Sequence, residues 1–246
     1  MNGNQDIFRF NRSSSSFLQV PGQLQIVSAG GEGQVWSLNA QEEIYHLVNG
    51  TFQRQAGALK HLAVGPDGEI WGINQAQEIY CTLWFWSSNN PEYYDRCAIN
   101  GTFSSIPGSL TSLTIGNWQQ VWGLNARNEI YRFNHRTNRF EQIPGELKTI
   151  AAGPDEVWGV NSQNQIYRFN WSTERFEQVQ GSLKTITVGF NNEIWGLNSQ
   201  GRIFRYDRVN RRFEGAPGLL EQIVVGGRNE VWGVNQAGRI FRLRRP

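Results

Sequence analysis

The chain has 246 residues, of which 39% are hydrophobic and 18% charged, so it can bury a sizeable core and is not a largely disordered protein. Its apolar runs reach only about six residues, which is too short for a membrane-spanning helix, and we expect no membrane insertion. The 23 basic and 21 acidic side chains leave a net charge of +2. This charge is too small for phosphate-driven binding, so nucleic acid is not an expected partner.

The first residues, Met1 to Asp6, contain no basic stretch followed by an apolar one. A secretory leader is therefore not visible. We expect a cytoplasmic protein, with extracellular release left open.

A pentad repeats along the chain: an apolar residue, Trp, a small residue, a second apolar residue and Asn. It occurs six times, at Trp36, Trp71, Trp122, Trp158, Trp195 and Trp232. The spacings between these tryptophans are 35, 51, 36, 37 and 37 residues. The long spacing shows that the second repeat carries an insertion.

Each pentad is the second of four short segments, seen most clearly between Leu147 and Val179. The segments are rich in β-branched and aromatic residues and end at Gly, Asn, Pro or Ser, as β-strands do. Four antiparallel strands repeated every 37 residues or so predict an all-β fold, a six-bladed β-propeller of four-stranded blades. The small residue beside each Trp leaves a gap, which we expect the indole of a neighbouring blade to fill.

The two ends of the chain carry one strand too many. An Ile-aromatic pair typical of the third strand occurs seven times, from Ile7 to Ile240, against six Trp pentads. We expect Phe17–Val20 to close the ring as the fourth strand of the last blade, beside Ile240–Leu243. The spare strand, Ile7–Phe10, would then compete for the same position or pair with another chain. A homo-oligomer, either a dimer or a tetramer, is therefore expected.

The insertion in the second repeat runs from Cys81 to Cys97 and is rich in aromatic residues. It is interpreted as a hairpin arm that turns at Asn89–Pro91, with Trp84, Trp86, Tyr93 and Tyr94 in its strands. Such an arm would serve a subunit interface or a ligand contact, or fold onto its own blade. Cys81 and Cys97 flank the arm, and either a disulfide across its base or two reduced thiols would fit the sequence.

Catalytic and metal-binding patterns are not apparent. His46, His61 and His135 fall at unrelated places in the repeat, without further ligands at metal-binding spacing, and we expect neither a metal nor another cofactor. A nucleophile elbow and a phosphate-binding loop are missing as well. We therefore expect a protein that is not an enzyme.

The sixfold pattern instead predicts a ligand site copied at the seams between blades. Beside each Trp, the repeat offers a hydrogen-bonding residue two positions earlier, namely Gln34, Glu69, Gln120, Glu156, Glu193 and Glu230. It offers an Asn three positions later, namely Asn39, Asn74, Asn125, Asn161, Asn198 and Asn235. An aromatic face with carboxylate and amide groups suits a sugar. The structural alternatives are that each Trp belongs to the core between blades and that each Asn forms an Asx turn. The third-strand arginines, such as Arg132 and Arg168, are interpreted as edge or solvent contacts.

The segments Glu156-Val-Trp-Gly-Val-Asn161 and Gln165-Ile-Tyr-Arg-Phe-Asn170 resemble tectonin repeats. The resemblance covers residues 1–246 as a single domain, apart from the extreme N-terminus and the inserted arm at 81–97. Tectonin proteins are similar to fish-egg lectin and tachylectin-1, six-bladed propellers that bind glycans and agglutinate bacteria. The leaderless fungal members are associated with O-methylated mannose and fucose. The resemblance thus implies a multivalent lectin of innate defence that binds bacterial or nematode glycans. Ser37 in place of the pentad Gly and the inserted arm depart from the pattern.

The alternative function is a propeller scaffold for protein–protein interaction, because tectonin repeats also occur in larger membrane-trafficking proteins. A scaffold would need one distinctive face and no repeated pocket. A carbohydrate-cleaving enzyme would need a pair of carboxylates at one site, which the sequence does not offer.

Overall fold

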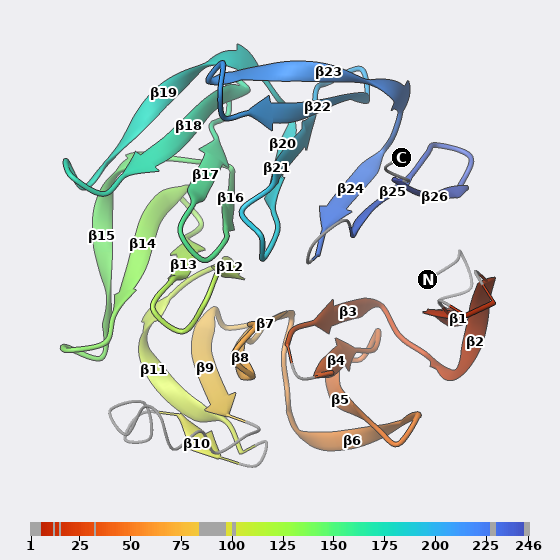
Figure 1. Ribbon diagram of the computed structural model, residues 1–246. Helices are drawn as coiled ribbons and strands as arrows, with labels where there is room; N and C mark the ends of the chain where they lie inside the picture. Colours follow the sequence, from red (N-terminus) through yellow and green to blue (C-terminus); the bar gives the residue numbers. More distant parts are fainter. Residues whose placement is uncertain are drawn as a thin grey trace. The chain divides into compact units, whose positions relative to one another are not determined.

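The structure is a computed structural model that describes residues 6–11, 13–14, 16–31, 33–83, 97–99, 102–226 and 230–243. The elements in these ranges are all β-strands, and the fold class is the predicted all-β, six-bladed propeller; five blades have the expected four antiparallel strands, and the other two sheets are a three-stranded sheet and a hairpin (Figure 1). The chain forms two compact units, residues 1–109 and 110–246. Within the described ranges, no helix is long and apolar enough to cross a bilayer.

The second unit contains three complete four-stranded blades and a three-stranded sheet. In each blade the strands follow chain order, with the first strand on the inside and the fourth on the outside in Figure 1. The blades are β12 (Ser112–Ile115), β13 (Val121–Leu124), β14 (Glu129–Asn134) and β15 (Arg139–Glu146); β16 (Thr149–Ala152), β17 (Val157–Val160), β18 (Gln165–Asn170) and β19 (Arg175–Ser182); and β20 (Thr185–Val188), β21 (Ile194–Leu197), β22 (Arg202–Asp207) and β23 (Arg212–Leu219). The last sheet consists of β24 (Gln222–Val225), β25 (Val231–Val234) and β26 (Ile240–Arg242).

The first unit contains a hairpin and two blades. The hairpin pairs β1 (Asp6–Asn11) with β2 (Ser16–Gln23). One blade consists of β3 (Ile26–Ala29), β4 (Val35–Leu38), β5 (Glu43–Val48) and β6 (Thr51–Ala58). The other consists of β7 (His61–Val64), β8 (Glu69–Ile73), β9 (Glu78–Leu83) and β11 (Ser104–Ser109), with the short β10 (Ala98–Ile99) parallel to the end of β9.

The turn between the second and third strands has the same form in every repeat. Asn161, for example, follows β17, and its side-chain oxygen accepts hydrogen bonds from the backbone N–H groups of Gln163 and Gln165. The residue six places after each Trp adopts the left-handed conformation, with φ between 64° and 75°, at Glu42, Gln77, Asn128, Asn164, Gly201 and Gly238. The Asx-turn interpretation of the repeated Asn is therefore confirmed.

A Gly-x-Leu connector joins consecutive blades. In the connector after β19, Gly181 has φ +127° at a β-bulge, and the N–H of Leu183 donates to the carbonyl of Asn164. The Leu183 side chain then covers Gly196, where an added methyl group would come within 2.6 Å of its Cδ1. The expectation that an indole fills the gap beside the repeat Trp was wrong, because the leucine of the connector packs into this gap.

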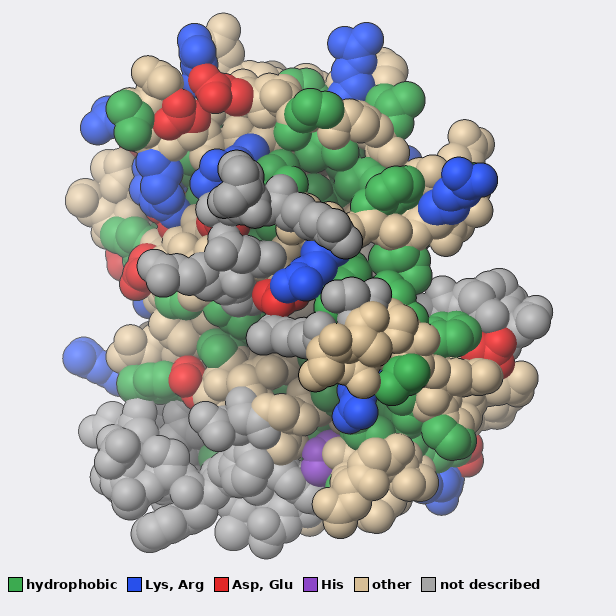
Figure 2. Space-filling model, turned by 45° about the vertical axis from the view of Figure 1, so that its right-hand side comes forward, with side chains coloured by type: hydrophobic (Ala, Val, Ile, Leu, Met, Phe, Trp, Pro, Cys, Tyr) green, Lys and Arg blue, Asp and Glu red, His purple; other side chains and the backbone are tan. Residues whose placement is uncertain are grey.

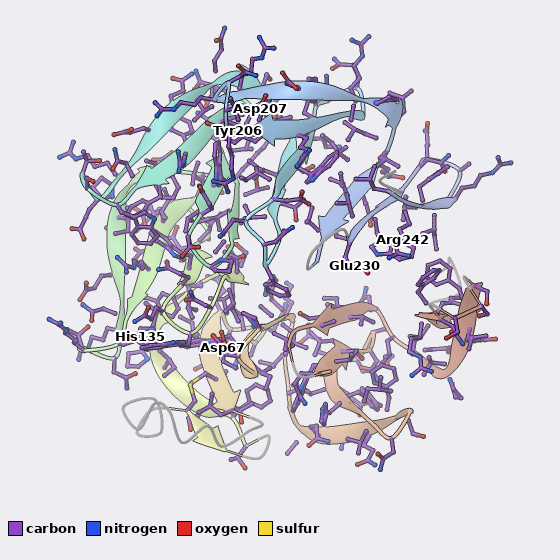
Figure 3. The ribbon with its side chains drawn as sticks, viewed as in Figure 1. Asp67, His135, Tyr206, Asp207, Glu230 and Arg242 are labelled. Atoms are coloured by element: carbon purple, nitrogen blue, oxygen red, sulfur yellow. A yellow bond between two sulfur atoms is a disulfide. The ribbon has the colours of Figure 1, made fainter. Side chains whose placement is uncertain are left out.

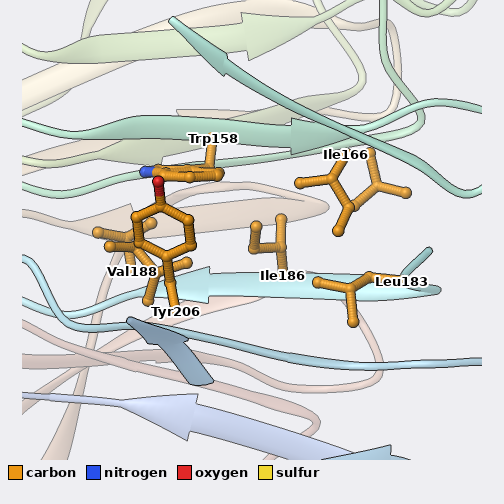
Figure 4. Close-up of a cluster of buried hydrophobic side chains, with 8 residues drawn as sticks. Trp158, Ile166, Leu183, Ile186, Val188 and Tyr206 are labelled. Carbon is orange, nitrogen blue, oxygen red and sulfur yellow. The ribbon is translucent and has the colours of Figure 1, made fainter. Parts of the chain in front are cut away.

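The tryptophans nevertheless form the core between blades, as the structural alternative predicted. Trp158 is fully buried and packs against Tyr206 of the following blade, in a cluster that also contains Val188, Ile186 and Leu183 (Figure 4). Trp36 and Trp122 occupy the equivalent positions in their own clusters. Trp195 does the same with Val231 of the last sheet, so within each unit the Trp of one blade packs onto the next.

The N-terminal strands pair locally. The register of the hairpin, with Ile7 opposite Val20, matches that of Ile166 opposite Val179 within a complete blade. The structure therefore pairs Phe17–Val20 with the supposedly spare strand β1, rather than with Ile240–Leu243 as expected. Both candidate strands carry the Ile-Phe-Arg pattern, and the nearer one costs less loop-closure entropy.

Cys81 and Cys97 form a disulfide, with their Cα atoms 5.2 Å apart. Of the two states that the sequence left open, the structure has the oxidised one. The aromatic arm predicted between them, including Trp84, Trp86, Tyr93 and Tyr94, lies outside the described residues.

The connector leucine gives a test of the blade packing. We expect Leu183→Ala to lower the free energy of unfolding by about 2–5 kcal/mol, because it leaves a cavity over Gly196. Leu219→Ala is the control, since Leu219 is 63% exposed and should cost far less. Chemical denaturation of both variants measures the difference, and equal losses would contradict this account of the seam.

Candidate functional site

In four of the six repeats, the acid or amide two residues before the Trp accepts a hydrogen bond from the indole. The Trp158 Nε1–H donates to Glu156 at 2.9 Å, and the Trp122 Nε1–H donates to Gln120 at 3.0 Å. Gln34 and Glu230 accept the same hydrogen bond in their repeats, at 3.2 and 3.0 Å. An indole N–H that is taken out of water needs such an acceptor. At these positions the predicted ligand-binding group is therefore engaged inside the protein.

Third-strand arginines complete this arrangement in three repeats. Arg168 forms two 2.9 Å hydrogen bonds to Glu156, while Arg205 binds Glu193 at 3.0 Å. Arg242 binds Glu230 at 3.1 Å, and Figure 3 shows these two side chains close together. Each guanidinium lies 5.4–5.8 Å from the centre of its Trp ring. These arginines are partly exposed, in line with the expected solvent contacts, but they also neutralise the acid of the seam.

The first repeat uses an uncharged version of the same contact. His46 takes the place of the arginine and stacks on Trp36, with 4.5 Å between the ring centroids. Burial lowers the pKa of His46, which favours the neutral imidazole. A neutral ring beside the neutral Gln34 avoids an unpaired charge.

Glu69 in the second repeat has no such partner. Cys81, which is held in the disulfide, occupies the place of the arginine. Glu69 is fully buried, and neither of its carboxylate oxygens accepts a hydrogen bond within the described part of the chain. Burial raises the pKa of Glu69 to about 8, and the charge of Asp67 contributes in the same direction. At neutral pH this carboxyl is therefore mainly protonated.

The predicted set of Trp, acid or amide, and Asn does not meet at one place. The Trp and its acceptor lie at one end of the second strand, whereas the Asn lies beyond the other end, in the turn. The rings of Trp36, Trp71, Trp122 and Trp158 are fully buried and present no face to a ligand. The candidate site must therefore be sought at the Asn end of the strands.

At that end the structure brings together three groups that include a tyrosine the sequence analysis missed. Asn74 donates to Glu78 at 2.6 Å, and the Tyr80 hydroxyl donates to the same carboxylate at 3.0 Å. This hydrogen bond raises the pKa of Tyr80. The cluster recurs as Asn39, Glu43 and Tyr45; Asn125, Glu129 and Tyr131; and Asn161, Gln165 and Tyr167. Its signal was the pattern Asn-x-x-x-Glu/Gln-Ile-Tyr, which the last two repeats replace with Arg and Phe.

Two pockets lie at this end of the seams, one in each unit. The pocket between blades β3–β6 and β7–β11 has a volume of about 560 Å³, and the pocket between β12–β15 and β16–β19 about 420 Å³. Six equivalent positions line both: Ile44 and Ile130, Gly57 and Gly145, Leu59 and Leu147, Asn74 and Asn161, Tyr80 and Tyr167, and Phe103 and Phe176. The repeat thus builds the same pocket twice.

A third pocket, of about 720 Å³, lies between the blade β20–β23 and the sheet β24–β26. Asn198 and Asn235 line it, together with Lys184 and Glu221, but its lining contains no aromatic side chain. Since the following sheet has three strands, the aromatic fourth-strand wall of the other two pockets is missing here.

The two aromatic pockets offer apolar rings and neutral hydrogen-bonding groups; the second also has Glu146 and Lys148 in its lining. Partly buried Tyr and Phe rings stand beside an Asn side chain and aliphatic groups, and the first pocket has no carboxylate or cationic residue in its lining. Within the described ranges, no three His, Cys, Asp or Glu residues are grouped as metal ligands. On the face shown in Figure 2, basic and acidic side chains are interspersed and form no single basic field.

The buried Glu69 predicts a pH dependence of stability. Because its folded pKa lies above the usual value, the folded chain keeps a proton that the unfolded chain releases, and stability should fall as the pH rises from about 4.5 to 8. We expect Glu69→Gln to flatten this decline, whereas Glu221→Gln at an exposed position should keep it. Denaturation midpoints between pH 5 and 9 measure both, and an unchanged decline in Glu69→Gln would contradict the assignment.

Solved structures similar to this chain share its fold at low sequence identity. Human WBSCR16 matches with a TM-score of 0.67 and 11% identity, covering 83% of this chain and 70% of that one. Yeast RCC1 (Prp20) bound to Kap60 matches at 0.69 and 11%, covering 89% and 69%. YCF48 bound to D1 peptide matches at 0.64 and 14%, covering 91% and 80%. At such identities the likeness concerns the fold alone.

Comparison with curated protein sequences gives no significant match. The Tectonin domain family matches residues 1–139 and 83–212, which together make up most of the chain. These ranges contain five of the six Trp pentads, from Trp36 to Trp195, with their Asx turns, and both aromatic pockets. The chain therefore belongs to the Tectonin domain family.

Proposed function

We propose that this protein is a lectin and that the two aromatic pockets are its glycan-binding sites. The observation that carries the proposal is the recurrence of one pocket, lined by the same six positions, at two seams. A site that is copied with its repeat suits a ligand that is itself repeated. The surface glycans of bacteria or nematodes are such ligands, and an agglutinin of innate defence would bind them.

The lining supports a neutral sugar. The rings of Tyr80 and Phe103 suit the C–H face of a pyranose, while Asn74 and the Tyr80 hydroxyl can exchange hydrogen bonds with its hydroxyl groups. Ile44 and Leu59 add an aliphatic wall. We infer that this wall receives a sugar O-methyl group, and that O-methylated mannose or fucose is the preferred ligand.

Affinity would come from several sites acting together. A shallow site that holds one sugar is weak, but linked sites gain roughly 10²–10⁴-fold in avidity on a repetitive surface. The proposed assembly is a homo-oligomer, a dimer or tetramer formed through the N-terminal strand or the inserted arm. The proposed activity is binding without catalysis, with glycans as the only ligands required.

Replacing the pocket tyrosines tests the site. We expect Tyr80→Ala combined with Tyr167→Ala to weaken binding of methylated mannosides by about tenfold or more, because each pocket loses a stacking ring. Tyr45→Ala is the matched control, since Tyr45 bonds Glu43 in the same way but lines neither pocket. A glycan array followed by calorimetry makes the measurement.

If the double variant binds as well as the unchanged protein, the pockets are not the sites. If the array shows no sugar binding and a pull-down recovers one stoichiometric protein partner, the scaffold function replaces the lectin.

The methyl group has an effect of its own. Burying it contributes on the order of 0.8 kcal/mol, so we expect a methylated mannoside to bind about fourfold more tightly than the unmethylated one. Competition between the two sugars for the same immobilised protein measures this ratio. Equal affinities would exclude O-methyl recognition while leaving the lectin assignment intact.

A further inference from the structure

Arg132 occupies an unusual position at the seam between blades β12–β15 and β16–β19. Its guanidinium lies 5.7 Å from the centre of the buried Trp122 ring and 4.9 Å from that of Trp171, which follows β18 in the next blade. Arg132 stands on β14 opposite Trp122, at the Trp end of the strands. The sugar pocket of the same seam lies at the other end, where Asn161 and Tyr167 line it.

The arginine lacks the carboxylate that its counterparts bind. Gln120 stands where four other repeats have Glu, and its oxygen accepts the Trp122 indole hydrogen bond at 3.0 Å. Across the described residues, no Asp or Glu forms an ion pair with Arg132. Burial lowers the pKa of Arg132, and the charges of Glu174 and Glu141 oppose this only in part. A partly buried cation therefore remains without a directly bound anion.

The neighbouring seam shows what a guanidinium in this position binds. There Arg168 holds Glu156 through two 2.9 Å hydrogen bonds. Arg208, which takes the sequence position of Trp171 in its own repeat, holds the same carboxylate at 2.6 Å. The protein thus fills this place with a carboxylate, and planar guanidinium groups bind carboxylates in paired geometry.

Trp171 gives the place a second binding element. Its ring is 39% exposed, and its Nε1–H donates to the backbone carbonyl of Asp155 at 3.1 Å, which fixes its orientation. The ring of Phe169 packs edge-on against it, with 4.7 Å between centroids. A fixed, partly exposed indole beside a cation suits a ring compound that carries an acid group.

We propose that Arg132 and Trp171 form a second ligand site, which binds an acidic sugar through its carboxylate. Arg132 pairs with the carboxylate in place of the missing glutamate, and the Trp171 indole supports the sugar ring. The site is separate from the two aromatic pockets and stands whether or not these bind glycans.

The experiment uses the full chain and free sugars as probes. Methyl glucuronide and methyl sialoside are titrated with NMR detection of the Trp171 indole N–H, and methyl glucoside, galactose 6-sulfate and acetate serve as comparison ligands. The decisive variant is Gln120→Glu, which supplies the carboxylate that Arg168, Arg205 and Arg242 bind in their seams. Gln119→Glu adds the same charge at an exposed neighbouring residue and is the matched control.

We expect the acidic sugars to shift the Trp171 signal and methyl glucoside to leave it unchanged. Gln120→Glu and Arg132→Gln should each weaken this binding by about tenfold or more, with Gln119→Glu close to the unchanged protein. The proposal is overturned if neither acidic sugar binds, or if Gln120→Glu binds like the control. Equal binding of acetate would overturn the sugar part, and equal binding of the sulfated sugar would overturn the carboxylate part.

Discussion

The packing of one buried tryptophan onto the following blade is the constraint on which the rest of the structure depends. Large apolar rings that leave water supply the association between sheets, but each indole brings a polar N–H with it. In the repeat of Trp158, Glu156 stands two residues earlier and accepts the indole hydrogen bond. Arg168 forms an ion pair with this acid and neutralises its charge. Much of the repeated sequence therefore serves the seam itself.

The sequence predicted the architecture well because the same pattern of strands and turns occurs in six copies. The period of 37 residues, the strand-like segments and the regular Asn turns all pointed to one class of fold. The core role of Trp158 and the Asx turn at Asn161 were also weighed correctly as structural alternatives. A repeated sequence does not show which of two apolar side chains packs into a given gap. The gap beside the repeat Trp, which was expected to hold an indole, is filled by Leu183.

The candidate site was located less well, for a related reason. A residue that recurs with every repeat satisfies the demands that all repeats share, and those demands are chiefly structural. The pockets depend on positions where repeats differ, such as Tyr167 against Phe204, and on two blades meeting in space. The same holds for Gln120 beside Arg132, where a single neutral substitution leaves a cation without its anion. Both proposed sites therefore rest on differences between the copies as well as on what they share.

The N-terminal hairpin has a consequence for how the chain folds. Strands β1, β14 and β18 carry almost the same sequence, so a fourth strand meets several acceptable partners, and side-chain complementarity alone hardly distinguishes them. The choice falls to the partner that is reached first, across a short turn, as the pairing of β1 with β2 illustrates. During synthesis, each hairpin would therefore form before later copies of the third strand emerge. The order in which strands become available, rather than differences in their sequences, would then pair each fourth strand with its own blade.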